Sequence, residues 1–218
     1  MEKFRRFICG TSPYDTEESL LETLSGAFKG NEYTAIGTAF HSVVENGVAG
    51  LQSQNGIYDI EAEGRVVRLN KNHVEIAGAY RAGLKGASFE VKIGKDYDTP
   101  FFPIHVSGRT DIIHGLEVRD TKTKYSTPKM QDYCDSYQWR YYLDILQADT
   151  FYFDVFYFEK YKKEEHGTDV SSLILTPYEP IECIRYAQLE YDTQQLVSDF
   201  CEYITFRNYH HLLKLKEN

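Results

Sequence analysis

The chain lacks several features that would place it in a well-defined class of protein. Its four cysteines, Cys9, Cys134, Cys183 and Cys201, form no C-x-x-C pair. The sequence therefore predicts neither a zinc site nor a disulfide framework. It predicts free thiols in a reducing compartment. No apolar run reaches the length of a membrane helix, and residues 1–6 are followed by too short an apolar stretch for a signal peptide. We therefore expect a cytoplasmic protein with no membrane contact.

Internal repeats, low-complexity segments and domain linkers are also missing from the 218 residues. With 42% hydrophobic and 15% aromatic residues, the chain predicts one folded domain, 1–218, with a substantial core. The net charge of −9 counts against broad, non-specific affinity for DNA. Residues 61–124 nevertheless hold eleven Lys and Arg against nine Asp and Glu, which is compatible with a basic substrate path on an acidic body.

The hydrophobic pattern predicts a mixed α/β (α+β) protein. Residues 4–10 are expected to form an edge strand or an arm, and Ser12 is the expected cap of the first helix. Residues 149–158 are apolar on both faces, as in a covered central strand. Helices are expected over 13–28, 33–52, 74–84, 128–147 and 191–215, and strands over 57–60, 65–69, 87–93, 105–113, 116–123, 149–158 and 170–177.

Two of these strands are expected to form a hairpin that gathers charged residues on one face. If residues 114–115 are the loop, Asp111 pairs with Val118, and Asp111, Asp120 and Lys122 converge on one side. A solvated face with a diagonal ion pair is one interpretation. The other is a divalent-metal site, because two carboxylates suit Mg²⁺ or Mn²⁺ and the lysine can orient water or stabilise developing charge.

Two helical stripes add candidate residues. His41 follows Gly37 by four residues on the expected helix 33–52, and Tyr142 follows Gln138 by four on the expected helix 128–147. A single histidine on such a helix is more often a surface or core residue than a ligand, and a helical tyrosine more often packs. The order of these motifs along the chain is stronger evidence for a function than either pair of residues alone.

That order resembles the PD-(D/E)XK nuclease superfamily, and within it the RecB-like exonuclease branch. The resemblance covers about residues 33–147 and rests on Gly37-x-x-x-His41, Gly108-Arg-Thr-Asp111, Asp120-x-Lys122 and Gln138-x-x-x-Tyr142. It implies a restriction-endonuclease-like core, with a central mixed sheet between helices. Some relatives carry an iron–sulfur cluster on one early and three clustered late cysteines; the late spacing here does not match, so no cluster is expected.

The resemblance also implies roles for individual residues. Glu90 is the matching candidate for an acidic ligand on the preceding strand, although Glu61 or Glu63 could take its place. One or two Mg²⁺ or Mn²⁺ ions would be held by His41, Glu90, Asp111, Asp120 and the Thr121 carbonyl. The catalytic residues would be Asp111, Asp120 and Lys122, and the substrate would be held by Gln138, Tyr142, Arg109 and Lys124.

The expected activity is metal-dependent hydrolysis of DNA phosphodiester bonds, by an exonuclease that acts on DNA ends in phage or bacterial recombination and repair. DNA would be the main partner, with a single-strand-annealing or recombination protein as a second. A ring-shaped homo-oligomer would lessen the conflict with the acidic net charge. The alternatives are a structure- or site-specific endonuclease of the same superfamily and a non-catalytic nucleic-acid-binding protein that keeps the fold.

Overall fold

The computed structural model of the chain describes residues 1–10, 13–27 and 29–213. The helices are α1 (Glu2–Cys9), α2 (Glu17–Ser25), α3 (Glu32–Asn46), α4 (Lys71–Gly83), α5 (Met130–Cys134), α6 (Gln138–Leu146), α7 (Lys163–His166), α8 (Leu189–Arg207) and the 3₁₀ helix η1 (His210–Leu212). The strands are β1 (Ile57–Ala62), β2 (Arg65–Asn70), β3 (Ser88–Tyr97), β4 (Ile104–His114), β5 (Glu117–Lys124), β6 (Thr150–Phe158), β7 (Leu175–Pro177) and β8 (Ile181–Ile184).

Six of the strands form a central mixed sheet, so the expected fold class is confirmed. The strand order is β3-β4-β5-β6-β7, and β8 also pairs with β6. Only β5 and β6 run parallel; the other pairs are antiparallel. Strand β6 is buried on both faces, as its aromatic sequence predicts. The pair β1–β2 forms a separate two-stranded sheet.

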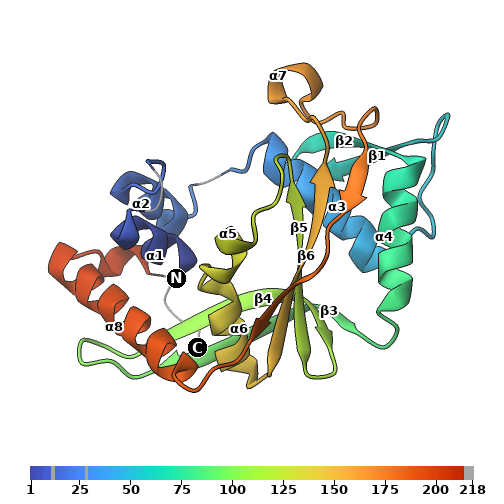
Figure 1. The fold of residues 1–218 in the computed structure, drawn as a ribbon. Helices are drawn as coiled ribbons and strands as arrows, with labels where there is room; N and C mark the ends of the chain where they lie inside the picture. Colours follow the sequence, from blue (N-terminus) through green and yellow to red (C-terminus); the bar gives the residue numbers. More distant parts are fainter. Residues whose placement is uncertain (11–12, 28, 214–218) are drawn as a thin grey trace.

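The central sheet splits between β4 and β5. These strands pair at only three positions, from Ile112–Arg119 to His114–Glu117, whereas the β3–β4 ladder extends to Tyr97–Ile104. Beyond Ile112 the long β3–β4 hairpin therefore leaves the rest of the sheet. Figure 1 shows β3 and β4 running across the lower part of the molecule while β5 and β6 rise through its centre. Residues at the split lie between two diverging halves of the sheet.

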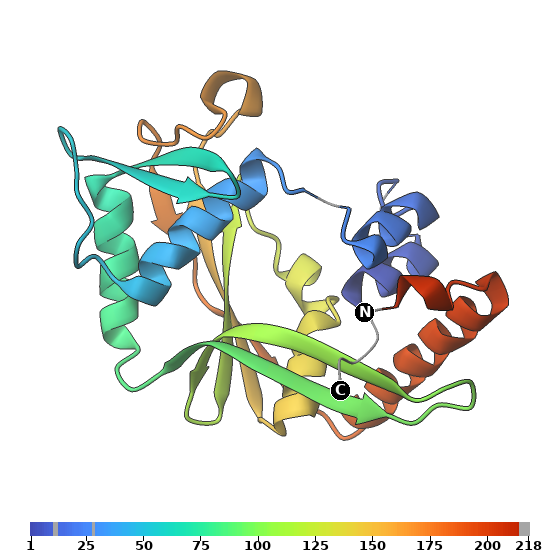
Figure 2. The ribbon, with the colours of Figure 1, turned by 180° about the vertical axis from the view of Figure 1, so that it is seen from behind.

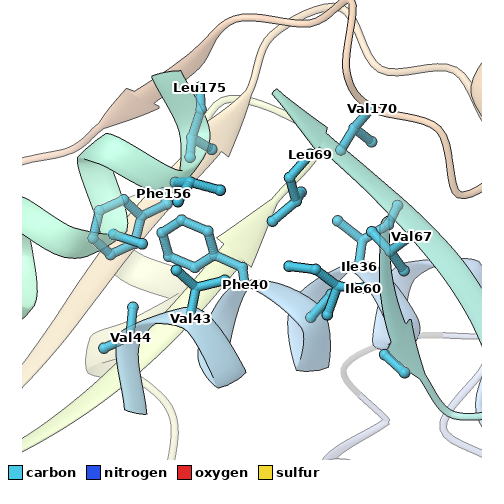
Figure 3. Close-up of a cluster of buried hydrophobic side chains, with 14 of the residues drawn as sticks. Ile36, Phe40, Val43, Val44, Ile60, Val67, Leu69, Phe156, Val170 and Leu175 are labelled. Atoms are coloured by element: carbon cyan, nitrogen blue, oxygen red, sulfur yellow. The ribbon is translucent and has the colours of Figure 1, made fainter. Parts of the chain in front are cut away.

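Helices cover both halves of the sheet (Figure 2). Helices α3 and α4 and the β1–β2 hairpin share a core with β6, shown in Figure 3, where the Phe40 and Phe156 rings lie 4.7 Å apart. Helices α1 and α8 pack with the far end of the β3–β4 hairpin, where Tyr97 is fully enclosed. Helices α5 and α6 pack on β5 and β6 around Phe151 and Phe153. The split thus faces helices on both sides.

One N-terminal expectation is wrong, and another falls outside the described residues. Residues 4–10 are not a strand or arm, because Phe4 is buried at helical spacing against Phe200 and forms part of α1. Ser12, the expected cap of the first helix, lies outside the described residues. The described helix α2 begins after Thr16, whose side chain accepts a hydrogen bond from the Ser19 amide.

The helix expected over 128–147 is interrupted at residues 135–137, which separate α5 from α6. Glu2 of α1 accepts a hydrogen bond from the main-chain amide of Tyr137, and the Ser136 hydroxyl accepts one from the Gln138 amide. These side chains satisfy amides that a continuous helix would bond internally. The break allows α6 to begin at Gln138.

Among the described residues, no helix has both the length and the apolar character needed to cross a membrane.

Candidate metal and phosphodiester site

The β4–β5 turn determines which candidate residues lie opposite one another on the two strands, that is, at the same level of the sheet. The loop is 115–116 rather than 114–115, with Gly115 at a φ of 65°, where glycine adopts a left-handed conformation at little cost. His114 therefore pairs with Glu117, and the expected pairing of Asp111 with Val118 is wrong. The correction moves the register by two positions, so side-chain alternation is preserved. It places Asp111 at the level of Asp120.

Glu90 reaches the same level from the third strand. The β3–β4 register, with Phe89 opposite Ile112, puts Glu90 opposite Asp111, although these two residues form no ladder pair. Glu90 has a φ of 53°, which non-glycine residues rarely adopt. Asp111 Oδ2 accepts a hydrogen bond from the Thr121 amide at 2.7 Å, so a side chain replaces a main-chain partner where the sheet opens. Three adjacent strands thus present carboxylates at one level.

Helix α3 brings His41 to this opening. The helix begins with a capping box between Asn31 and Thr34. Gly37 faces β5 one turn before His41, and a Cβ there would lie 3.2 Å from Thr123 Oγ1. The missing side chain lets helix and strand approach closely. His41 Nδ1 lies 3.4 Å from Asp111 Oδ2.

His41, Glu90 and Asp111 form a group suited to a metal ion. Each offers one ligand atom, and these atoms lie within 4.8 Å of one another. Among the other acids considered, Glu63 lines the same cavity but accepts hydrogen bonds from the hydroxyls of Thr34 and Thr38. Glu61 is exposed and does not line this cavity. Among the described residues, Glu90 is therefore the one of the three acids whose carboxylate is grouped with His41 and Asp111.

Asp120 lies beside this group. Among the described residues, it is not one of those whose ligand atoms all lie within 4.8 Å of one another. Its side chain is almost completely buried on β5. Oδ1 accepts a 2.7 Å hydrogen bond from Gln138 Nε2, and Oδ2 lies 2.7 Å from Lys122 Nζ. That contact is an ion pair without hydrogen-bond geometry, and Oδ2 has no other polar partner among the described residues. A buried carboxylate oxygen is therefore still available to a further cation.

Burial and crowding of charge shift the pKa values at the site. Burial, followed by the charge of Asp120, raises the pKa of Asp111 to about 8. Burial also lowers the pKa of His41 against the attraction of Asp120, so its imidazole is neutral at pH 7 and can serve as a ligand. Burial would lower the pKa of Lys122, but Asp120 and Asp111 outweigh that effect and raise it. Lys122 is therefore a cation, not a base.

The Thr121 main chain also lies near His41, where it acts to raise the pKa of the imidazole against the larger effect of burial. Thr121 lies next to Asp120 on β5, and its amide donates in turn to Asp111. The five residues expected as metal ligands are thus gathered around the split, three of them at mutual ligand distance.

The four residues expected to hold substrate lie around the same opening. Gln138 contacts Asp120, and Tyr142 donates a 2.8 Å hydrogen bond to the carbonyl of Arg109, with its ring packed on Gly108. Arg109 is mostly exposed, and its Nη1 donates to Glu90 Oε2 at 2.9 Å. Lys124 lies two residues beyond Lys122 on β5, over the ring of Tyr133. Gln138 and Tyr142 therefore brace protein groups at the site.

Two cavities lie beside the candidate metal ligands, and Lys122 lines both of them. One, of about 680 Å³, runs along α3 and includes His41, Glu90 and Arg109. The other, of about 670 Å³, runs between β5, α5 and α1 and includes Lys124. Each is large enough to admit a nucleotide-sized group. Lys122 is thus a wall residue of both cavities.

The second cavity contains residues that sequence reasoning missed. Arg5 and Arg6 come from α1, far from β5 in the sequence, and Tyr133 comes from α5, which follows β5 closely. The basic pair in an amphipathic helix was the available signal, but nothing in the sequence indicates which strand α1 approaches. Hydrogen bonding of Glu2 to the Tyr137 amide places α1 there.

Comparison with known proteins adds little to this geometry. No protein-family model matches the chain, and no curated protein matches it. Among solved structures, the crystal structure of SSO0001 is similar at 19% sequence identity, with a TM-score of 0.38. The similar region covers 57% of this chain and 55% of that one, so this chain spans about half the length of its structural neighbour.

Proposed function

We propose that this protein is a divalent-metal-dependent deoxyribonuclease of the PD-(D/E)XK type, which removes nucleotides from DNA ends. The observation that supports the proposal is the convergence at the β4–β5 split. His41, Glu90 and Asp111 offer ligand atoms within 4.8 Å of one another, beside the ion pair of Asp120 and Lys122. Residues from α3, β3, β4 and β5 meet there, although packing alone does not require so many buried charges.

The donor set fits Mg²⁺ or Mn²⁺. Carboxylate oxygens suit both ions, and the neutral imidazole of His41 is well suited to Mn²⁺. His41, Glu90 and Asp111 would hold the ion, with Asp120 Oδ2 and the Thr121 carbonyl as further ligands. When bound, the ion supplies Lewis-acid activation of a phosphodiester and of the attacking water.

The other residues act by position and charge. Lys122 carries a positive charge next to the ligands and can neutralise charge on a phosphate oxygen or orient the attacking water. Gln138 holds the Asp120 carboxylate, and Tyr142 fixes the main chain at Arg109. The Arg109 side chain remains exposed at the mouth of the α3 cavity, where it can meet a phosphate.

Action on ends, and a place in recombination or repair, are the parts of the proposal that rest on resemblance. The wild-type protein is incubated with end-labelled linear double-stranded DNA in Mg²⁺, Mn²⁺ or EDTA, beside covalently closed circular DNA. We expect metal-dependent release of labelled nucleotides from the linear form only. The labelled end then gives the direction of cleavage.

Matched variants link that activity to the site. Asp111→Asn and Lys122→Met are expected to abolish cleavage, whereas Glu202→Gln and Lys71→Met, both at exposed positions on other elements, should leave it unchanged. Circular dichroism confirms that each variant is folded. Nicking of the circle would favour the endonuclease alternative. No cleavage of any DNA, with no Mn²⁺ binding by calorimetry, would leave a non-catalytic nucleic-acid-binding protein.

A further inference from the structure

The cavity between β5, α5 and α1 contains a buried polar group that has no hydrogen-bond partner in the described part of the chain. Tyr133 is only 5% exposed, and its hydroxyl has no hydrogen-bond partner among the described residues. Its ring packs against Phe153, with centroids 5.1 Å apart, and lines the cavity. Leaving a buried hydroxyl unpaired costs free energy, so such a group is informative about what the cavity admits.

A second group in the same cavity is a partly buried cation. Lys124 Nζ lies 5.3 Å from the centre of the Tyr133 ring and forms no salt bridge with a described carboxylate. Burial, together with the nearby charges of Lys122 and Arg6, lowers the pKa of Lys124, while Asp132 acts in the opposite direction. The repulsion between like charges at a cavity wall decreases when an anion binds between them.

Two of the carboxylates around this cavity are already engaged in hydrogen bonds. Of the three carboxylates, Glu2 accepts from the Tyr137 amide at 2.6 Å, and Asp135 accepts from Gln131 at 2.7 Å. Asp132 remains as an opposing charge near Lys124. Arg5 adds a basic group from α1, whereas Arg6, from the same helix, is paired with Asp15 at 3.1 Å. Lys122 and Lys124 thus line the cavity together with Tyr133, whose hydroxyl also lies near the charges of Asp132 and Asp120.

We propose that this cavity is a second phosphate-binding site, in which Lys124 and the Tyr133 hydroxyl contact a phosphate group of the DNA next to the one that is cleaved. The inference rests on the proposed nuclease function and extends it by naming where the strand continues. Because Lys122 lines both cavities, one strand can place one phosphate by the metal ligands and a neighbouring phosphate by Lys124. The ligand chemistry is a phosphate oxyanion, from an internal diester or a terminal monoester.

The test replaces single phosphates of an oligonucleotide by neutral methylphosphonates, one position at a time. Affinity of the full-length protein is measured by fluorescence anisotropy with Ca²⁺ in place of Mg²⁺, and cleavage is measured separately with Mg²⁺. We expect one position near the cleaved bond at which neutralisation weakens wild-type binding about tenfold. A terminal phosphate is compared with a terminal hydroxyl in a parallel arm, which separates the monoester from the diester source.

Two variants then assign the contact. Lys124→Met and Tyr133→Phe should each weaken binding of unmodified DNA, yet cause no further loss with the oligonucleotide neutralised at the sensitive position. Tyr133→Phe removes only a hydroxyl, so its ring packing on Phe153 is kept. Tyr152→Phe and Lys71→Met serve as controls, because those side chains lie outside both cavities.

The outcomes separate this inference from the proposed function. If the wild-type protein cleaves DNA but no phosphate position or terminus depends on Lys124 or Tyr133, the second site is refuted and the nuclease stands. If the dependence is found in the binding assay without cleavage, the phosphate site stands and the nuclease proposal fails.

Discussion

Gln138 Nε2 donates a 2.7 Å hydrogen bond to Oδ1 of Asp120, which links the first turn of α6 to the middle of β5. The bond leaves Oδ2 of the same carboxylate beside Lys122 Nζ. Gln138 and Lys122 therefore hold the Asp120 carboxylate from its two oxygens. The resemblance implies that Gln138 holds substrate, and in the folded chain its side chain also contacts a candidate metal ligand.

Removal of this bond should weaken metal binding. We expect Gln138→Leu to reduce Mn²⁺ affinity by about tenfold or more, because partners that orient a ligand contribute about that much. Calorimetric titration of Mn²⁺ into the wild-type and variant proteins measures the effect. Gln195→Leu, on an exposed part of α8, is the matched control. Equal affinities in the wild-type and Gln138→Leu proteins would show that Asp120 needs no such support.

Asp111 should make the stability of the metal-free protein depend on pH. Its pKa is raised to about 8, chiefly by burial, from an ordinary value of 3.8. Between these values the folded protein retains a proton that the unfolded chain has released, so the free energy of unfolding falls as pH rises. Urea unfolding in EDTA, from about pH 5 to about pH 8, should show this decline in the wild-type protein and a flatter profile in Asp111→Asn.

His41 contributes with the opposite sign, because its pKa is lowered and the unfolded chain binds the extra proton. The informative quantity is therefore the difference between the wild-type and Asp111→Asn profiles. Mn²⁺ requires a deprotonated Asp111, so wild-type affinity for the metal should increase over the same pH range. A metal affinity independent of pH would contradict ligation by Asp111.

The close approach of α3 to β5 at Gly37 should be necessary for metal binding. A Cβ at Gly37 would lie 3.2 Å from Thr123 Oγ1, so Gly37→Ala should displace the helix that carries His41 and lower Mn²⁺ affinity several-fold. Adding Thr123→Ala removes the contacting oxygen and should restore affinity. Gly83→Ala has no neighbour within 4 Å and is the control. Failure of the second substitution to rescue would place the cause elsewhere.

The core between α3 and β6 should dominate stability on that side of the sheet. Phe40 is fully buried and lies 4.7 Å from Phe156, ring centre to ring centre. Phe40→Ala should reduce the free energy of unfolding by about 3–5 kcal/mol, through lost burial and the cavity that remains. Phe206→Ala, where the ring is 84% exposed, should change it by less than about 0.5 kcal/mol. Urea denaturation compares the two, and similar losses would contradict this assignment of the core.

The sequence determined the elements whose signals are local. The alternation of side chains along residues 105–123 places Asp111 and Asp120 at matching positions even though the predicted loop is one residue too early. The apolar run that became β6 identified a strand covered on both faces. Such patterns depend on the periods of helix and strand, which each segment carries by itself.

Only the tertiary structure decided how these elements meet. Glu90 lies at ligand distance because the β3–β4 register brings it opposite Asp111, whereas the sequence left Glu61 and Glu63 as alternatives. The break before α6 depends on Glu2, more than a hundred residues away along the chain. The same packing places the basic face of α1 beside Lys124. Contacts between segments so far apart depend on packing and charge in three dimensions, and no periodicity of the sequence records them.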